Sequence, residues 1–262
     1  MAYQTIGLAV SASVATLTLN RPDAANGMNL QLMKELVDAV HSCEEDPQVR
    51  AIIITGAGRF FSAGGDLAAF SADLDRLPRL LSELTLYLHT AISRLARMNR
   101  PVIAAINGPC AGAGLSLACA CDLVLAAQSS NFTMAYTAAG LSPDGGSTWF
   151  IPRRIGDLRT RELMLTNRKL SAEEALQWGL VTRVIADEML LVEARKLAES
   201  LAAGPTVAYG NVKALLNDTF ARGMETQMEF ESRAIASSAK TADAREGVSA
   251  FLKKVKANFN GS

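Results

Sequence analysis

Apolar residues along the chain follow two patterns: short, largely β-branched runs, and longer segments in which every third or fourth residue is apolar. The short runs predict strands at residues 5–10, 14–19, 51–55, 102–106, 123–125, 131–134 and 181–185. The longer segments predict helices after Asn29, over residues 72–98, after Ser171 and from residue 188 onward. This mixture of buried strands and amphipathic helices predicts an α/β fold.

Residues 100–127 are the most informative stretch. An apolar strand breaks at Asn107, and small residues continue through Gly112 and Gly114, which predicts a strand, a tight turn, a short helix and another strand. The first N–H groups of such a helix have no partner in the helix, and little side-chain bulk covers them. They could bind a phosphate or the oxyanion of a polarised carbonyl, although tight packing on a sheet would also explain the small residues.

A second glycine-rich turn follows the strand at residues 51–55, in the segment Ser62–Asp66. Two such turns on neighbouring strands can present backbone N–H groups to one point. A carbonyl oxygen that accepts two of these hydrogen bonds sits in an oxyanion hole. The pair of turns therefore predicts a site that either turn alone would not.

Composition excludes several classes of function. The 262 residues are 49% hydrophobic and 20% charged, and 26 basic residues balance 26 acidic ones, so we expect neither nucleic acid nor a membrane surface as partner. Four cysteines without a CxxC pair and only two histidines predict no structural metal site and no disulfide framework. Neither a signal peptide nor an apolar stretch of about twenty residues is evident, which predicts a cytoplasmic protein.

Three polar residues outside the glycine turns are candidates for chemistry. His89 lies beside the apolar stripe of the helix over residues 72–98, where a partly buried histidine with a backbone partner is the favoured explanation. Tyr136 precedes a glycine-rich loop over residues 140–146, where a half-buried core tyrosine would explain it. Asp144 lies in that loop just before a predicted helix, where it could simply be an N-cap.

Six segments spread over nearly the whole chain resemble those of one known family: residues 19–22, 61–66, 100–108, 112–114, 175–181 and 245–251. Their sequences resemble the crotonase (enoyl-CoA hydratase/isomerase) superfamily. The loop at residues 141–146, LSPDGG, is most similar to the ring and enoyl-CoA isomerases of phenylacetyl-CoA breakdown.

The resemblance implies the crotonase (ClpP-like) fold, a spiral of ββα units. Residues 1–190 would form this core with the acyl-CoA site, and residues 191–262 a helical C-terminal trimerisation region. The helical pattern of that tail, with its recurring apolar residues, agrees with a role in oligomerisation. Members form homotrimers or dimers of trimers, bind acyl-CoA thioesters and stabilise a thioester enolate. No metal or other cofactor is expected, because coenzyme A enters as part of the substrate.

Site residues carry over by position. The resemblance makes the N–H groups of Gly65 and Ala113 the two oxyanion donors. Where the family often has a basic residue in the coenzyme A groove, this chain has Asp23, which removes one phosphate contact. The resemblance also implies further contacts to the substrate or to coenzyme A, namely Ala24, Ala25, Ser62, Ala63, Asp66, Leu67, Gly112, Phe251 and Lys254. Phe251 and Lys254 usually come from an adjacent subunit.

The catalytic positions select the reaction. Enoyl-CoA hydratases use two glutamates, and this chain has Ser116 and Tyr136 at those places, neither of which is a carboxylate base. Asp144 matches the acidic residue of the related isomerases. The resemblance therefore favours an enoyl-CoA double-bond isomerase with Asp144 as acid and base, and with Tyr136 and His89 as secondary site residues.

Two alternatives remain open. The 4-chlorobenzoyl-CoA dehalogenases use an aspartate nucleophile at the Asp144 position and a histidine base at the His89 position. Their aromatic cradle is replaced here by Gly65, Leu81 and Leu88, which favours an aliphatic or alicyclic acyl group. The second alternative is a catalytically silent acyl-CoA-binding or scaffold protein, motivated by the loss of both hydratase glutamates.

Overall fold

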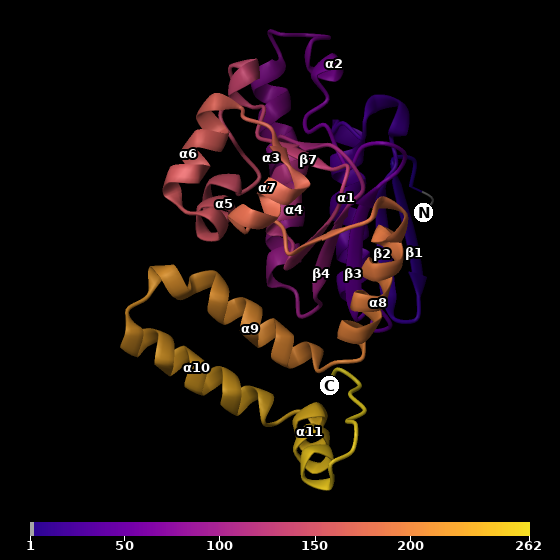
Figure 1. Cartoon of the computed structure of the whole chain (residues 1–262), viewed down its shortest axis with the longest axis vertical. Helices are drawn as coiled ribbons and strands as arrows, with labels where there is room; N and C mark the ends of the chain where they lie inside the picture. The colour runs from indigo at the N-terminus through magenta and orange to yellow at the C-terminus, as the bar shows by residue number, and fades with distance from the viewer. Residues whose placement is uncertain (1–2) are drawn as a thin grey trace.

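The computed structural model describes residues 3–262 as a sheet-based body with a helical C-terminal arm (Figure 1). The main sheet has the strand order β1-β2-β3-β4-β6-β9, in which β1 and β2 form an antiparallel hairpin and the other neighbours are parallel. Its strands are β1 (Ile6–Ser11), β2 (Val14–Leu19), β3 (Ala51–Gly56), β4 (Val102–Ile106), β6 (Leu123–Ala127) and β9 (Arg183–Ile185). A smaller sheet joins β5 (Cys110–Ala111), β7 (Asn131–Thr133) and β8 (Leu170–Ser171).

The central strands are continuously apolar because helices cover both faces of the main sheet. Ile52 and Ile54 of β3 point into a core shared with α1 (Leu30–Glu45) and α3 (Leu77–Arg97). Ile53 points to the opposite face, which α8 (Leu190–Ala202) covers with alanines and leucines. The α8 helix thus packs on the sheet of the body, next to β2, β3, β4 and β6.

Local sequence signals place most helix ends. The Asn29 side chain accepts a hydrogen bond from the Leu32 amide at 2.9 Å, as an N-cap does, and Ser171 forms a full capping box with Glu174 at the start of α7 (Ala172–Trp178).

Two predicted boundaries are wrong. The helix expected over residues 72–98 begins only at Leu77, where Pro78 occupies a first-turn position that favours a helix start. Residues 67–70 form the separate short helix α2 (Leu67–Phe70). The strand expected at residues 181–185 begins at Arg183, because the turn that ends α7 at Gly179 takes up the preceding residues.

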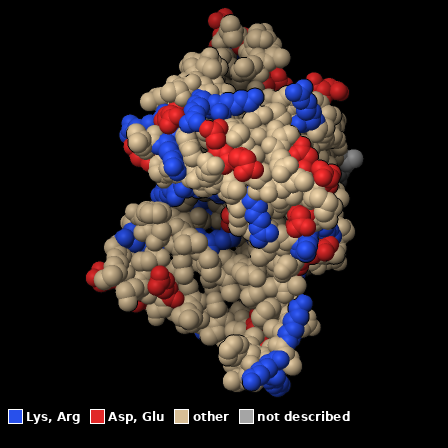
Figure 2. Space-filling model, viewed as in Figure 1, with Lys and Arg blue, Asp and Glu red and all other residues tan. Residues whose placement is uncertain are grey.

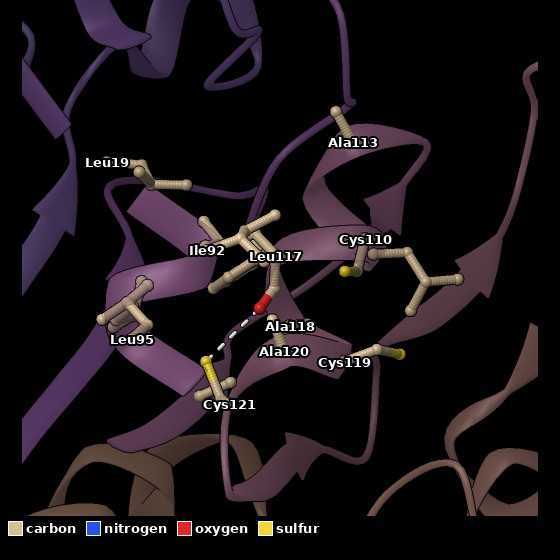
Figure 3. Close-up of a cluster of buried hydrophobic side chains, with 14 of the residues drawn as sticks. Leu19, Ile92, Leu95, Cys110, Ala113, Leu117, Ala118, Cys119, Ala120 and Cys121 are labelled. Atoms are coloured by element: carbon tan, nitrogen blue, oxygen red, sulfur yellow. Dashed lines mark hydrogen bonds between the residues drawn. The ribbon is translucent and has the colours of Figure 1, made fainter. Parts of the chain in front are cut away.

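The short helix α4 (Ala113–Ala120) is buried along its whole length, which explains its small residues. A methyl group built on Gly114 would stand 2.7 Å from the Ser62 Cβ atom, so the helix packs closely on the segment after β3. Figure 3 shows the cluster of buried side chains around α4, with the Cys121 thiol directed at the Leu117 carbonyl. Burial raises the pKa of the Cys119 thiol to about 11.

The arm beyond α8 consists of α9 (Thr206–Asp218), α10 (Met224–Ser238) and α11 (Ala242–Lys253). The helices α9 and α10 pack against each other and extend away from the body, and α11 lies beyond them (Figure 1). One anchor to the body is Lys213 of α9, whose ammonium group pairs with Asp122 at 2.8 Å and donates to the Leu95 carbonyl at 2.9 Å. The α8 helix packs with the body, and the arm extends from α9 onward. The division into two functional regions at residue 190 remains a prediction.

Charged side chains of both signs are interspersed over the surface in view (Figure 2), as expected from equal numbers of basic and acidic residues. In the described part of the chain, no helix combines the length and the apolar character needed to cross a membrane. The remaining helical elements are η1 (Pro22–Ala24), η2 (Thr137–Ala139), α5 (Ser147–Ile155), α6 (Asp157–Thr166), η3 (Asp187–Met189) and η4 (Thr219–Ala221).

Candidate active site

A cavity of about 250 Å³ lies where the two glycine-rich turns meet α3 and the loop between β7 and α5. Most of its wall is apolar, and Asp144 is the single carboxylate among the lining residues that the structure describes. The lining residues are Met28, Met33, Ala63, Gly65, Leu67, Phe70, Leu81, Leu84, Thr85, Leu88, Gly112, Ala113, Ala135, Tyr136, Ala139, Leu141, Ser142 and Asp144.

The two glycine turns are in direct contact. The Ala111 amide donates to the Ser62 carbonyl at 2.9 Å, which joins the turn after β3 to the segment before α4. Gly64 has a φ of +92°, and a methyl group there would stand 2.9 Å from the Ala111 carbonyl oxygen and 3.2 Å from the Ala113 nitrogen. Only glycine combines this backbone conformation with this close approach.

Gly65 and Ala113 both line the cavity. Within residues 3–262, neither N–H group donates a hydrogen bond to a protein acceptor. Ala113 is the first residue of α4, so its N–H has no partner within the helix. The Gly65 N–H is free because Met28 bonds to the carbonyl of Gly64 and to the amide of Asp66, and thus leaves the amide between them unpaired. The geometry therefore provides two free donors at one cavity.

An ion pair holds the first turn in place. The Asp66 carboxylate accepts from the Ala69 amide at 3.0 Å and pairs with the Arg21 guanidinium at 2.8 Å, and Arg21 also donates to the Gly27 carbonyl. Burial alone would raise the pKa of the Asp66 carboxyl, but these hydrogen bonds outweigh it and lower the pKa. Asp66 does not line the cavity, although sequence reasoning assigned it to the substrate.

Asp144 lies in the loop before α5, and Gly146, not Asp144, is the residue that precedes the helix. The Tyr136 hydroxyl donates a hydrogen bond to the Asp144 Oδ1 atom, and the Ser116 hydroxyl lies 3.1 Å from the same phenol. Burial, followed by the charge of Asp144, raises the pKa of Tyr136 above its ordinary value. Tyr136 is therefore a neutral donor that orients the carboxylate.

Ser116 is fully buried against the same loop. A methyl group on Gly145 would stand 2.8 Å from the Ser116 Cβ atom, and the Tyr136 hydroxyl lies 3.1 Å from the serine hydroxyl. A longer side chain at position 116 would have to displace the loop or the phenol. The small serine is therefore compatible with this packing at one of the two positions where hydratases have glutamate.

His89 lies at the edge of the site, outside the cavity lining. Its Nε2 atom accepts a hydrogen bond from the Gly145 amide at 3.1 Å and stands 4.0 Å from the Asp144 Oδ2 atom. The imidazole is half exposed and lines a separate, open hollow on α3. In residues 3–262, no group of three or more histidine, cysteine, aspartate or glutamate side chains is arranged to bind a metal ion.

The predicted substrate contacts divide into two sets. Ala63, Leu67 and Gly112 line the cavity together with the predicted catalytic residues Gly65, Ala113, Tyr136 and Asp144. The others lie elsewhere: Ala24 and Ala25 at the end of η1, Ser62 buried behind the turn, Phe251 exposed on α11 and Lys254 exposed directly after α11.

Sequence reasoning missed several wall residues. The side chains of Met28, Met33 and Phe70 line the cavity. Phe70 packs on Gly65, since a methyl group there would stand 2.7 Å from its ring. Their apolar character in the sequence is that of ordinary core residues, so only the fold distinguishes them.

Comparisons with known proteins agree with this geometry. The sequence profile described as enoyl-CoA hydratase/isomerase matches residues 9–262. The 1,2-epoxyphenylacetyl-CoA isomerase of Escherichia coli strain K12 is 40% identical over 253 residues, with 96% of this chain and 97% of that protein covered. The 4-chlorobenzoyl coenzyme A dehalogenase-2 of an Arthrobacter species is 36% identical, with 86% and 82% covered. A crystal structure of enoyl-CoA hydratase from Bacillus anthracis matches with a TM-score of 0.92 at 31% identity, with 99% and 100% covered.

The chain belongs to the enoyl-CoA hydratase/isomerase family, and it is an acyl-CoA enzyme of that family. The predicted membership of the crotonase superfamily and the predicted α/β crotonase fold are thereby confirmed. Because these relatives carry the names of an isomerase, a dehalogenase and a hydratase, the residues of the site have to distinguish among the reactions.

Proposed function

We propose that the protein is an enoyl-CoA isomerase that shifts a carbon–carbon double bond through an enolate, with Asp144 as the acid and base. One observation carries the proposal: the cavity has a single carboxylate in its described lining, and the same lining includes two residues whose backbone N–H groups have no protein acceptor. A double-bond shift needs one group that removes a proton from one carbon and returns it to another. Asp144 has the chemistry for that transfer.

The steps balance without a further reactant. The thioester oxygen would accept hydrogen bonds from the N–H groups of Gly65 and Ala113, which stabilise negative charge as it develops. Asp144 takes a proton from the α or γ carbon, and the C–H electron pair enters the conjugated enolate. The protonated carboxyl then returns the proton to the other carbon. The donor bond from Tyr136 keeps Oδ1 occupied and leaves Oδ2 for the proton.

The wall of the cavity supports an apolar acyl group. Leu81, Leu84 and Leu88 of α3 line the cavity, and Phe70 and Leu141 extend its apolar surface. The substrate class that fits is an aliphatic or alicyclic enoyl thioester. Coenzyme A is bound as part of this substrate, and no further cofactor takes part in the proposed steps.

The test is ultraviolet detection of conjugated enoyl thioester formed from a panel of 3-enoyl-CoAs. We expect product from the wild type and a loss of at least about 100-fold in kcat for Asp144→Asn, because positioned acid–base groups contribute at least that factor. Asp157→Asn is a matched control, since Asp157 is exposed and pairs with Arg161 one turn away. If Asp144→Asn still binds the thioester and has the same kcat as the wild type, the proposal is refuted.

A second candidate is hydrolytic chemistry with Asp144 as nucleophile and His89 as base. Two observations favour keeping it: the 36% identity to the Arthrobacter dehalogenase and the 4.0 Å between the His89 Nε2 and Asp144 Oδ2 atoms. Trapping of a covalent acyl-enzyme on Asp144, detected by mass spectrometry, would establish this candidate. If no thioester is turned over and Asp144→Asn leaves thioester binding unchanged, the chain is a silent acyl-CoA-binding or scaffold protein.

We also propose a homotrimer or a dimer of trimers, supported by the apolar surface of the arm. Large apolar side chains of α9–α11 and η4 are exposed in the single chain, among them Leu216, Phe220, Met228, Ile235, Val248 and Phe251. Exposed apolar surface on this scale marks a protein interface. Light scattering after size-exclusion chromatography should give a mass of three or six chains, and a monomer would contradict the proposal.

A further inference from the structure

The loop that carries Asp144 has little conformational stiffness of its own. Gly140, Gly145 and Gly146 have φ values of +70°, +60° and +71°, which glycine adopts without cost. Backbone of this kind is held in one conformation by contacts from outside the loop. The direction of the Asp144 carboxylate therefore depends on those contacts.

Three contacts fix the loop around the carboxylate. Tyr136 bonds to the Asp144 side chain, and the Ser147 amide and hydroxyl both donate to the Asp144 carbonyl, at 3.2 and 2.9 Å. The third contact is the hydrogen bond from the Gly145 N–H to the His89 Nε2 atom at 3.1 Å. That N–H belongs to the peptide group directly after Asp144. The bond therefore sets the orientation of the peptide plane next to the Asp144 Cα atom, to which the side chain is attached.

We propose that His89 is a positioning residue that holds the Asp144 loop through the Gly145 amide, an inference that rests on the proposed role of Asp144. Because Nε2 accepts this hydrogen bond, the neutral ring carries its proton on Nδ1. The lone pair that a general base would use is thus already engaged. At 4.0 Å, the Asp144 Oδ2 atom is too far for a hydrogen bond to the ring. His89 acts on the reaction through the backbone.

Two substitutions separate this role from a base. In His89→Gln the amide oxygen can occupy the position of Nε2 and accept from Gly145, but it cannot take up a proton. His89→Leu keeps the bulk and removes the acceptor. We expect a 10- to 100-fold lower kcat for the leucine variant, the range that follows from a small misplacement of a catalytic group, with KM for the thioester nearly unchanged. The glutamine variant should stay within a few-fold of the wild type.

Hydrogen exchange provides a readout independent of activity. Peptides covering residues 140–147 should exchange faster in His89→Leu than in the wild type, and His89→Gln should restore most of the protection. His41→Leu is the matched control, because His41 is exposed on α1 and should alter neither measurement. Since His89 is half exposed, the leucine variant should fold, which its circular dichroism spectrum and melting temperature check.

The outcomes are distinct. Equal loss of kcat in both variants means that His89 is a base and overturns the proposal. Wild-type kcat and exchange in both variants mean that the Gly145 bond positions nothing, which also overturns it. If Asp144→Asn retains full activity, the proposed function fails, but exchange in His89→Leu still reports whether the imidazole holds the loop.

Discussion

The hydroxyl of Tyr136 donates a hydrogen bond to the Asp144 carboxylate from the opposite side of the same loop, eight residues earlier in the chain. The bond engages Oδ1 of the carboxylate and leaves Oδ2 without this partner. Tyr136 also contacts Ser116. The two residues that stand where hydratases have glutamates are therefore in contact with each other, and one of them bonds to Asp144.

The first prediction concerns this bond. Tyr136→Phe removes the donor from a charged acceptor, which contributes about 1.5–3 kcal/mol, so we expect a 10- to 100-fold lower kcat with the ring packing intact. Steady-state isomerase assays measure the effect. An unchanged kcat would show that Asp144 is oriented without the phenol.

The second prediction concerns the hydratase position at Ser116. Because Gly145 and Tyr136 fill the surrounding space, Ser116→Glu should bury an unpaired or misplaced carboxylate and lower the free energy of unfolding by about 3 kcal/mol or more. We expect no hydratase activity in this variant. Ser116→Ala is the control and should lose about 1 kcal/mol at most. Hydration of crotonyl-CoA by the glutamate variant would contradict the packing argument.

The third prediction concerns stability in acid. Burial of Glu35 opposes its ionisation, but hydrogen bonds from Thr5, Gln4 and Gln31 outweigh this and lower its pKa from 4.5 to about 2. A lowered pKa contributes stability that is fully present above pH 4.5 and is lost as the pH falls from about 4.5 to about 2. Glu35→Gln should therefore be less stable than the wild type at pH 7, with a difference that shrinks in acid. Urea unfolding at pH 7 and pH 3 tests this, and parallel losses for both proteins would contradict it.

The fourth prediction concerns the anchor of the arm. Lys213→Met removes the ion pair with the partly exposed Asp122 and the hydrogen bonds to the Leu95 and Arg100 carbonyls, and the loss of such charged hydrogen bonds costs about 1.5–3 kcal/mol. The double variant with Asp122→Asn should recover part of that loss. Lys196→Met, at an exposed position, is the control. Chemical denaturation measures all three, and an unaffected Lys213→Met would mean that the arm docks without this pair.

Sequence patterns predicted the parts of the fold that depend on neighbours along the chain. The strands around Ile53 and Ile103 are apolar throughout because they are covered on both faces, and the caps at Asn29 and Ser171 depend on contacts within three residues. Such signals are local. The family resemblance added Gly65, Ala113 and Asp144, which the structure brings to one cavity.

Contacts between distant residues were beyond that reasoning. The ion pair of Arg21 with Asp66 joins residues 45 positions apart, and the bond of Gly145 to His89 spans 56. Nothing in the local sequence distinguishes Asp66 as a support of the turn from Asp66 as a substrate contact. Likewise Phe70 reads as an ordinary core residue, and only the fold places its ring on Gly65.

The two free donors of the cavity are peptide groups, and this has an evolutionary consequence. Apart from proline, any residue at position 65 or 113 still supplies an N–H, so point mutations can distort these donors but rarely delete them. The carboxylate on the glycine-rich loop, in contrast, is removed by a single substitution. A lineage built on this scaffold can therefore exchange its reaction by changing side chains around a constant backbone.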